Sequence, residues 1–287
     1  MMTTENVLIL GYGRLGAAFS RLYSPIYAIR GVRRSQNQDE SAIVVQMPIQ
    51  DDALRPHLEW ANVIIFCPAP ERKDIQAYRE TYQDNMQFLL NLMGHRPASS
   101  LHLIILISSI GVYPRTGDRC WSETDHLFIA TPFQEILLAT EQAVASRAIP
   151  YTILRAGGLY GEGRGYHHRV MQQGYINSSE MSEQWISSVH QDDLCGVIDQ
   201  VIKQKKIGTI YNLVDQSHLR KRELVAWMAR EMELPIVSDG PPTDADSHRR
   251  ICTTKVMEEL GYQFRYPTII EFLEERKRRD EKPRQRG

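Results

Sequence analysis

The segment that most constrains the fold lies near the start of the chain, where the apolar run NVLIL at 6–10 leads into GYGRLG at 11–16. Glycines spaced as GxGxxG after a strand and at the start of a helix are typical of a phosphate-binding turn. Gly11 permits the tight turn, Gly13 lets the backbone approach a pyrophosphate, and Gly16 allows the helix to pack closely on the strand. Free N–H groups and the helix dipole then favour an anion at the helix N-terminus. We therefore predict a dinucleotide site; the alternative is a glycine-rich packing turn.

Short apolar runs alternate with longer helical patterns along most of the chain. Near-continuous apolar strands separated by helices are typical of a parallel sheet that is covered on both faces. Because crossovers between parallel strands are right-handed, we predict a Rossmann-type, doubly wound α/β fold with a smaller C-terminal substrate lobe. The predicted strands are 6–10, 26–29, 42–47, 62–67, 101–108, 151–155, 186–190 and 208–214, and the predicted helices are 17–23, 74–93, 131–146, 192–205 and 221–232.

Two stretches, 164–188 and 238–250, break this alternation and indicate insertions over the C-terminal edge of the sheet. We predict a dinucleotide-binding core over residues 1–160. A substrate-side lobe over 161–275 would be interleaved with the last strands of the core. Residues 276–287 are dense in charge of both signs, so we expect a solvated helix end and tail.

The bulk composition excludes several classes of partner. A formal net charge of −1 and 24% charged residues give no basic surface for nucleic acid or membrane over the whole chain. No run approaches the roughly 20 apolar residues of a membrane span. The four cysteines lack CxxC spacing, so we expect neither a zinc site nor a disulfide framework, and a cytoplasmic location. We expect a small-molecule substrate, no nucleic acid and no membrane, and leave homodimer formation open.

The second predicted strand bears on which dinucleotide binds. An acid about 20 residues after the glycine turn would bind the ribose 2′-OH of NAD. The stretch IYAIRGVRRS carries instead Arg30, Arg33 and Arg34, and guanidinium groups suit a 2′-phosphate. Asp39 and Glu40 lie too far along to serve as the ribose acid. We expect NADP, with NAD less favoured; the alternative is three surface arginines.

Several further motifs occur in a recognisable order. They are NVIIFC, Asn85 within YQDNMQFLL, SSIGVY, WSETD, ILRAGGLYGEGRG, VHQDDL, GTIYNLVD and ELGYQFRYP. Together with GYGRLG, this set resembles the extended short-chain dehydrogenase/reductase superfamily, in its NAD-dependent epimerase/dehydratase branch. The resemblance spans about residues 6–273. It implies a bound nicotinamide dinucleotide and a serine at the strand end that orients the substrate.

The resemblance fails at the pair that carries the standard chemistry. Members of the family use Tyr-x-x-x-Lys on the helix after the serine-bearing strand, where the tyrosine exchanges a proton with the substrate oxygen. Their glutamate, eight residues after the tyrosine, matches Glu141. Counting back places Phe133 at the tyrosine and Leu137 at the lysine, and 131–146 holds neither residue type. Residues at positions 133, 137 and 141 share one helix face. Standard acid–base chemistry is therefore predicted to be absent.

The resemblance also assigns individual positions. As catalytic candidates we retain Ser109, for which backbone capping is the alternative, and Tyr113, for which packing is the alternative. The segment matching Ala156–Gly158 lines the nicotinamide. His190 and Asp193 match a structural link, and His167 and His168 are interpreted as loop polarity. The predicted cofactor-binding residues are Gly11, Tyr12, Gly13, Arg14, Leu15, Gly16, Arg30, Arg33, Arg34, Cys67, Pro68, Ser108, Ala156, Gly157 and Gly158.

Two functions remain open at this point. The first is an NADP-linked oxidoreductase, epimerase or dehydratase on a small carbonyl or sugar-like substrate, with Tyr113, Tyr160 or a water held by Ser109 as the proton donor. The second is a catalytically inactive NADP-binding sensor or regulatory protein.

Overall fold

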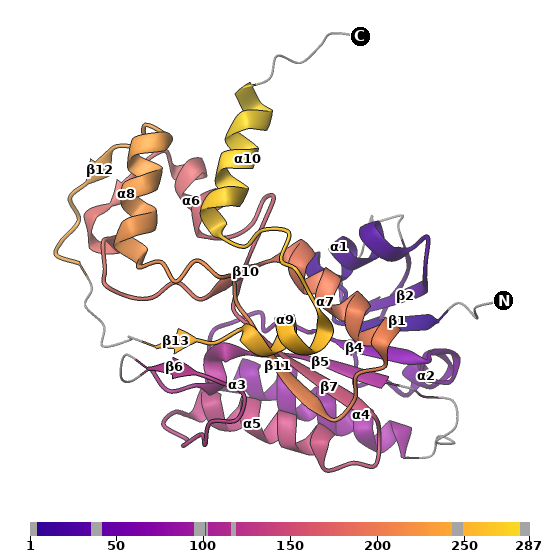
Figure 1. The fold of residues 1–287 in the computed structure, drawn as a ribbon. Coiled ribbons are helices and arrows are strands. Elements are labelled where there is room, and N and C mark those ends of the chain that lie inside the picture. Colours follow the sequence, from indigo (N-terminus) through magenta and orange to yellow (C-terminus); the bar gives the residue numbers. More distant parts are fainter. Residues whose placement is uncertain are drawn as a thin grey trace, which may run out of the picture. The chain divides into compact units, whose positions relative to one another are not determined.

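A seven-stranded sheet lies at the centre of the fold (Figure 1). The computed structural model describes residues 5–35, 42–94, 101, 103–115, 119–242 and 249–281. The strands of the sheet are β1 (Asn6–Leu10), β2 (Ala28–Arg33), β3 (Ile43–Gln46), β4 (Val63–Phe66), β5 (Leu103–Ser109), β7 (Tyr151–Ala156) and β11 (Thr209–Leu213).

The strand order is β11-β7-β5-β4-β1-β2-β3. β1 pairs in parallel with β2 on one side, where Val7 faces Ile29, and with β4 on the other, where Val7 faces Val63. The chain therefore winds in opposite directions from β1, and β1 and β4 meet at the switch point. Ligands of such sheets bind outside the carboxyl ends of the strands at this point. The predicted doubly wound parallel fold is confirmed.

Helices cover both faces of this sheet, with α4 and α5 along one face and α1 and α7 along the other (Figure 1). The apolar side chains of β1, β4 and β5 form a core with α2, α4 and α5. The helices are α1 (Arg14–Tyr23), α2 (Arg55–Trp60), α3 (Ile75–Tyr78), α4 (Asn85–Met93), α5 (Pro132–Ala145), α6 (Tyr166–Gln173), α7 (Gln191–Gln204), α8 (Lys221–Glu231), α9 (Thr254–Leu260) and α10 (Ile269–Glu281). Short 3-10 turns cover Asp52–Leu54, Ile110–Val112 and Ser178–Glu180.

Several predicted elements have other bounds in the structure: the first helix begins at Arg14 instead of 17, and the strand predicted over 186–190 is Ser188–His190. The second strand runs over Ala28–Arg33 instead of 26–29, because pairing with β1 begins at Asn6 and Ala28. The predicted helix 74–93 is divided by a π-helical segment at Arg79–Asp84. Asp74 caps its start, where the side chain accepts a hydrogen bond from the N–H of Ala77 at 2.8 Å.

The chain divides into two compact units that interleave in sequence. Unit 1 comprises residues 1–114, 126–155 and 195–211, and unit 2 comprises 115–125, 156–194 and 212–287. Unit 2 has its own core, formed by α6, α8 and α10 around Tyr160 and Phe272. Its small sheets pair β8 (Gly158–Tyr160) with β10 (Ser188–His190), β9 (Ile176–Asn177) with β12 (Ile236–Val237), and β6 (Cys120–Trp121) with β13 (Arg250–Ile251).

The expectation for the cysteines is wrong in one respect. Cys120 and Cys252 form a disulfide within unit 2, with their Cα atoms 5.6 Å apart. The two residues are 132 positions apart in the sequence, and the pairing of β6 with β13 brings them together. Spacing along the chain gave no sign of this contact. Cys67 and Cys195 are not part of this disulfide.

Candidate dinucleotide site and the region around α5

The glycine turn after β1 is held between its two neighbouring strands. The N–H groups of Gly11 and Tyr12 both donate to the carbonyl of Val32 on β2, at 3.0 and 2.8 Å. Gly11 has φ +87°, and a β-carbon there would lie 2.4 Å from Cα of Pro68, which follows β4. The thiol of Cys67 donates to the Gly11 carbonyl at 3.5 Å. Gly11, Cys67 and Pro68, all predicted for the cofactor site, therefore lie together at the switch point.

The start of α1 is open where a phosphate is expected. Gly13 is exposed, and a β-carbon on it would meet nothing nearer than the Gly11 carbonyl oxygen at 3.9 Å. No side chain caps this end of α1, and its first turn contains no acidic residue. Arg14 is exposed, and Leu15 is buried beneath it. The backbone N–H groups and the helix dipole at the start of α1 thus favour an anion. The residues present fit a dinucleotide pyrophosphate.

Tyr12 and Gly16 serve packing at this turn. The Tyr12 ring is buried, and a β-carbon at Gly16 would come within 2.8 Å of its Cδ2 and 3.3 Å of Ile9 on β1. A β-carbon at Gly31 of β2 would come within 2.3 Å of the same Cδ2. The Tyr12 ring therefore occupies the space that the glycines at 16 and 31 leave. The Tyr12 side chain therefore serves packing, and its N–H is used in the hydrogen bond to Val32.

The three predicted arginines have different surroundings. Arg30 lies within β2 opposite Leu8, and its guanidinium stacks 4.0 Å from the centroid of the Trp60 ring. Arg33 ends β2 and donates to the Ser35 hydroxyl at 2.8 Å. Arg34 follows it and forms an exposed ion pair with Glu71 at 2.9 Å. Arg33 and Arg34 are thus at the strand end where a ribose is expected, while Arg30 is used in packing on α2.

The end of β5 carries the predicted serine. The Ser109 Oγ accepts a hydrogen bond from the N–H of Gly111 at 3.0 Å and begins a 3-10 turn, which is the capping arrangement. A β-carbon on Gly111 would lie 3.1 Å from Ser109 Oγ and 3.3 Å from Leu137 Cδ1. Leu137 of α5 therefore packs beside the serine-bearing turn. This is the neighbourhood in which the family resemblance expects a lysine.

One turn earlier on α5, Phe133 packs against another helix. Its ring meets the Tyr78 ring edge to face, with the centroids 4.8 Å apart. Thr131 caps the helix, its hydroxyl accepting from the N–H of Gln134 at 3.3 Å. The predicted helix 131–146 and its apolar face at positions 133 and 137 are both present.

A buried polar network surrounds Glu141, which lies one turn after Leu137 on the same face of α5. The Ser108 hydroxyl donates to Glu141 at 2.6 Å, and Arg155 of β7 donates to the same carboxylate at 2.7 Å and to the Tyr113 hydroxyl at 2.7 Å. The side chains of Glu141 and Arg155 are 6% and 5% exposed, so the charges neutralise each other out of water. The carboxylate and the Tyr113 hydroxyl raise the pKa of Arg155 and outweigh the opposing effect of burial, the largest single cause.

This network bears on two sequence predictions. Tyr113 is fully buried and its hydroxyl accepts a hydrogen bond from Arg155, as expected if the side chain serves packing. A catalytic role for Tyr113 stays a prediction. Ser108 is used in the network instead of facing solvent. Sequence reasoning missed Arg155. The signal was a charged residue inside the apolar strand YTILRA.

The predicted nicotinamide segment belongs to unit 2. Ala156 is buried at the end of β7, and the N–H of Gly157 donates to the Leu213 carbonyl at 2.9 Å. A β-carbon at Gly157 would lie 2.6 Å from the Ser187 carbonyl oxygen. Gly158 is exposed, and its N–H donates to the Ser187 carbonyl at 2.9 Å. Close backbone approach therefore accounts for Gly157, while Gly158 offers an open surface.

Aromatic residues pack around histidines in unit 2. Tyr160, named above as an alternative donor, is 1% exposed and packs against His190 and Phe272, at centroid distances of 5.3 and 5.6 Å. Burial raises the pKa of its phenol. The interpretation of His167 as loop polarity is wrong, because the residue lies on α6 and is fully buried against Tyr160. Burial lowers the pKa of His167 to about 4, so its ring is neutral near pH 7.

Asp193 holds the segment between α9 and α10 within unit 2. Its carboxylate accepts hydrogen bonds from the Tyr262 hydroxyl at 2.9 Å and from the N–H groups of Arg265 and Tyr266 at 2.6 and 3.1 Å. Burial raises its pKa against the effect of these donors. The contacts are those of a structural residue.

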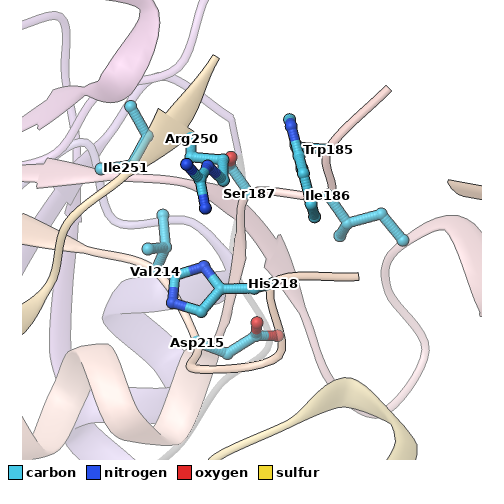
Figure 2. A pocket seen from close by; sticks show the side chains of 8 residues that line it. All are labelled: Trp185, Ile186, Ser187, Val214, Asp215, His218, Arg250 and Ile251. Carbon is cyan, nitrogen blue, oxygen red and sulfur yellow. The ribbon is translucent and has the colours of Figure 1, made fainter. Parts of the chain in front are cut away.

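Unit 2 also has a hollow lined by polar and aromatic side chains (Figure 2). Trp185 stacks with Arg220 at 4.2 Å and with Arg250 at 5.4 Å. Burial raises the pKa of Asp215 at its base to about 6, although Ser188 and Ser217 donate to it. The lining residues are Trp185, Ile186, Ser187, Val214, Asp215, His218, Arg250 and Ile251.

The described residues offer neither a metal site nor a membrane-spanning helix. No group of three or more His, Cys, Asp or Glu residues in that part of the chain could hold a metal ion. Within the same residues, no helix is long and apolar enough to cross a membrane.

Comparison with solved structures shows the same architecture throughout the chain. A functionally unknown conserved protein from Silicibacter pomeroyi is 23% identical, with a TM-score of 0.79 and coverage of 96% of this chain and 99% of that one. A putative NAD-dependent epimerase/dehydratase from Methylobacillus flagellatus is 20% identical, with a TM-score of 0.76 and coverage of 95% and 97%. DesIV, a dTDP-glucose 4,6-dehydratase from Streptomyces venezuelae crystallised with NAD and TYD, is 18% identical, with a TM-score of 0.78 and coverage of 96% and 97%.

The chain shares its fold with these proteins. At these identities the likeness shows the fold alone. In sequence, the protein YeeZ of Escherichia coli K12 is 29% identical over 115 residues, which is 40% of each chain. The chain thus aligns with about two fifths of the length of that curated relative. No family model matches the sequence.

Proposed function

We propose that the protein is an NADP-linked oxidoreductase, epimerase or dehydratase that acts on a small carbonyl or sugar-like substrate with non-standard acid–base groups. The observation that carries the proposal is the open, uncapped start of α1 at Gly13, next to the switch point between β1 and β4. Structures of the same fold that were crystallised with NAD, such as DesIV, support a nicotinamide dinucleotide as the ligand class.

The preference for NADP rests on the end of β2. Arg33 and Arg34 lie where the adenosine ribose would be held. Arg34 is now paired with Glu71, with both side chains largely exposed. Exposed pairs of this kind contribute about 0–1 kcal/mol, so exchange of the carboxylate for a 2′-phosphate costs little.

The chain's own residues would bind and orient the reactants. A bound nicotinamide supplies or accepts the hydride. Backbone N–H groups at the start of α1 would hold the pyrophosphate. The Ser109 Oγ accepts from Gly111, and its own O–H donates to no other described group, so it would hold the substrate oxygen. Leu137 beside it excludes water from that position without moving a proton.

Nucleotide titration followed by a turnover screen tests the proposal. NADPH and NADH would be titrated by fluorescence, and turnover measured over a panel of carbonyl compounds and nucleotide sugars. We expect tighter binding of NADPH and turnover of at least one panel member. Absence of binding by both nucleotides would overturn the dinucleotide site, and preference for NADH would overturn the arginine argument.

A second candidate function is a sensor or regulatory protein that binds NADP without turnover. The apolar pair Phe133 and Leu137 at the positions of the missing tyrosine and lysine favours it. Tight NADPH binding without turnover across the panel would support this candidate over the first.

A further inference from the structure

Two tyrosines lie next to the apolar start of α5. Tyr78 ends α3, and Tyr82 lies four residues later within the π-helical segment. Their ring centroids are 5.4 Å apart, and the Tyr78 ring is also 4.8 Å from that of Phe133. Tyr78 and Tyr82 are called the phenol pair, and the Tyr78 ring contacts the position of α5 at which the resemblance expects a tyrosine.

The backbone beneath the phenol pair is unusual. The helix changes from α to π winding at Arg79 and returns to α at Asn85. The Asn85 amide, at the end of this segment, donates to the Thr81 carbonyl at 3.1 Å. π-helical turns are rare and occur frequently at functional sites. The segment packs on α5, so its winding decides which side chains meet Phe133.

The hydroxyl groups of the phenol pair are not used by the fold. Among the described residues, neither the Tyr78 nor the Tyr82 hydroxyl has a hydrogen-bond partner, and both side chains are half-buried. Two buried tyrosines of unit 1 differ: Tyr27 donates to Asp199 at 2.7 Å, and Tyr113 accepts from Arg155. The hydroxyl groups of the phenol pair are thus left for a ligand or for solvent.

Tyr82 of the phenol pair is within electrostatic reach of Cys67, which follows β4. Burial raises the pKa of Tyr82, and the nearby Tyr78 and Cys67 raise it further. Cys67 in turn donates to the carbonyl of Gly11. An electrostatic interaction and a hydrogen bond thus relate Tyr82 to the glycine turn through Cys67, and a ring contact relates Tyr78 to Phe133.

We propose that Tyr78 is the proton donor that α5 lacks, and that Tyr82 is a positioning residue that holds its ring. This inference rests on the proposed oxidoreductase function. In the reduction direction, a bound reduced nicotinamide would supply the hydride for the new C–H bond at the substrate carbonyl carbon. The carbonyl oxygen gains a proton as the O–H bond of Tyr78 breaks. Water then returns a proton to the phenolate, so the balance is carbonyl, reduced nicotinamide and one proton giving alcohol and oxidised nicotinamide.

Kinetics of a phenylalanine variant test the donor role. With NADPH and 9,10-phenanthrenequinone as the probe, we expect Tyr78→Phe to lower kcat about 100-fold, because loss of a positioned acid typically costs about 10²–10⁴-fold. The Kd for NADPH should change less than about twofold. Tyr151→Phe, a half-buried tyrosine of β7 in the same unit, is the matched control and should leave kcat unchanged.

A rescue variant separates donation from packing. Phe133→Tyr in the Tyr78→Phe background places a phenol on the neighbouring ring, and we expect it to restore kcat at least about tenfold. A loss in Tyr78→Phe that Phe133→Tyr leaves unchanged would overturn the donor role, since Tyr78 would then only pack. A Tyr78→Phe kcat equal to that of Tyr151→Phe would overturn it directly.

Nitration gives a readout that needs no turnover. Tetranitromethane labels accessible phenols, and peptide mass spectrometry reports each site. We expect saturating NADP to slow labelling of Tyr78 several-fold and to leave Tyr175, exposed on unit 2, unaffected. Equal labelling of Tyr78 with and without NADP would overturn the inference. Failure of wild-type protein to bind NADPH would overturn the proposed function instead, and binding without quinone reduction would overturn the donor role and favour the sensor.

Discussion

The glycine turn after β1 and the first turns of α5 both correspond to functional elements in the family that the sequence resembles, but they differ in what they keep. At the turn, Gly11 has the positive φ, and Gly13 the open space, that phosphate binding requires. On α5, Phe133 and Leu137 have the positions of a proton donor and its lysine without their chemistry. One region has the backbone geometry that the resemblance expects, and the other lacks the two side chains that it expects.

The difference shows that binding and chemistry can separate in one fold. A phosphate site made of backbone N–H groups depends on the absence of β-carbons, so any side chain at Gly11 removes it. A proton donor is a single side chain, and a neighbouring helix can bring another to the same place. Tyr78, which ends α3 directly before the π-helical segment and contacts Phe133, is the residue proposed for this role.

The largest effect is expected at Gly11. Gly11→Ala places a β-carbon 2.4 Å from the Pro68 backbone at φ +87°, and we expect a loss of more than about 4 kcal/mol in the free energy of unfolding. Gly174→Ala is the matched control, since it has φ +79° with nothing within 4 Å, and should cost about 1 kcal/mol. Chemical denaturation measures both. Equal losses would show that the turn does not need the close approach to Pro68.

The next effect concerns the polar residue on the same face of α5. Glu141→Ala leaves Arg155 charged and buried, so we expect a loss of about 3–5 kcal/mol in the free energy of unfolding. Glu135→Ala, at an exposed position of the same helix, should change it by less than about 0.5 kcal/mol. A small change in the free energy of unfolding of Glu141→Ala would mean that the buried Glu141 carboxylate serves something other than the stability of the fold.

A smaller effect is expected at the end of β2. Arg33→Glu places a negative charge where a 2′-phosphate would bind, and we expect NADPH affinity to fall about 10- to 100-fold with little change for NADH. Arg21→Glu, in the last turn of α1, controls for net charge. Competition titrations of the two nucleotides report the ratio. An unchanged ratio would leave the arginines as surface residues.

The smallest effect comes from restoring the missing pair. Phe133→Tyr with Leu137→Lys adds a phenol and a ribose-binding ammonium beside Ser109, and we expect NADPH to bind up to about tenfold more tightly, with weak reductase activity as a further outcome. Leu137→Met is the size-matched control. If the double variant binds NADPH no better than the wild type, the α5 register or the site assignment is wrong.

Much of the fold could be predicted because its signals are local. β1, the glycine turn, β4 and β5 are apolar runs ended by breakers, and buried parallel strands require such runs. The predicted second strand ended at residue 29, before Arg30 and Arg33, because charged residues are unusual in a buried parallel strand. The structure shows that Arg30 stays on the strand by stacking on Trp60, a contact between residues 30 positions apart.

Most of the missed features depend on contacts between different elements. Cys120 meets Cys252 across 132 residues, and Arg155 of β7 meets Glu141 of α5 and Tyr113. The phenol pair depends on a change in helical winding that no periodicity of 3.6 residues predicts. His167 appeared to lie in a polar loop, because its burial is set by Tyr160 and Phe272.

The central claim is that the start of α1 holds a dinucleotide through open backbone at Gly13, and a single variant tests it most directly. Gly13→Ala adds a β-carbon that meets no protein atom nearer than 3.9 Å, at φ −113°, so the melting temperature should equal that of the wild type. The same β-carbon would occupy the space through which a pyrophosphate approaches, so calorimetric titration should show NADPH binding weakened at least about tenfold. Equal NADPH affinity in Gly13→Ala and wild type, with both proteins folded, would contradict the account.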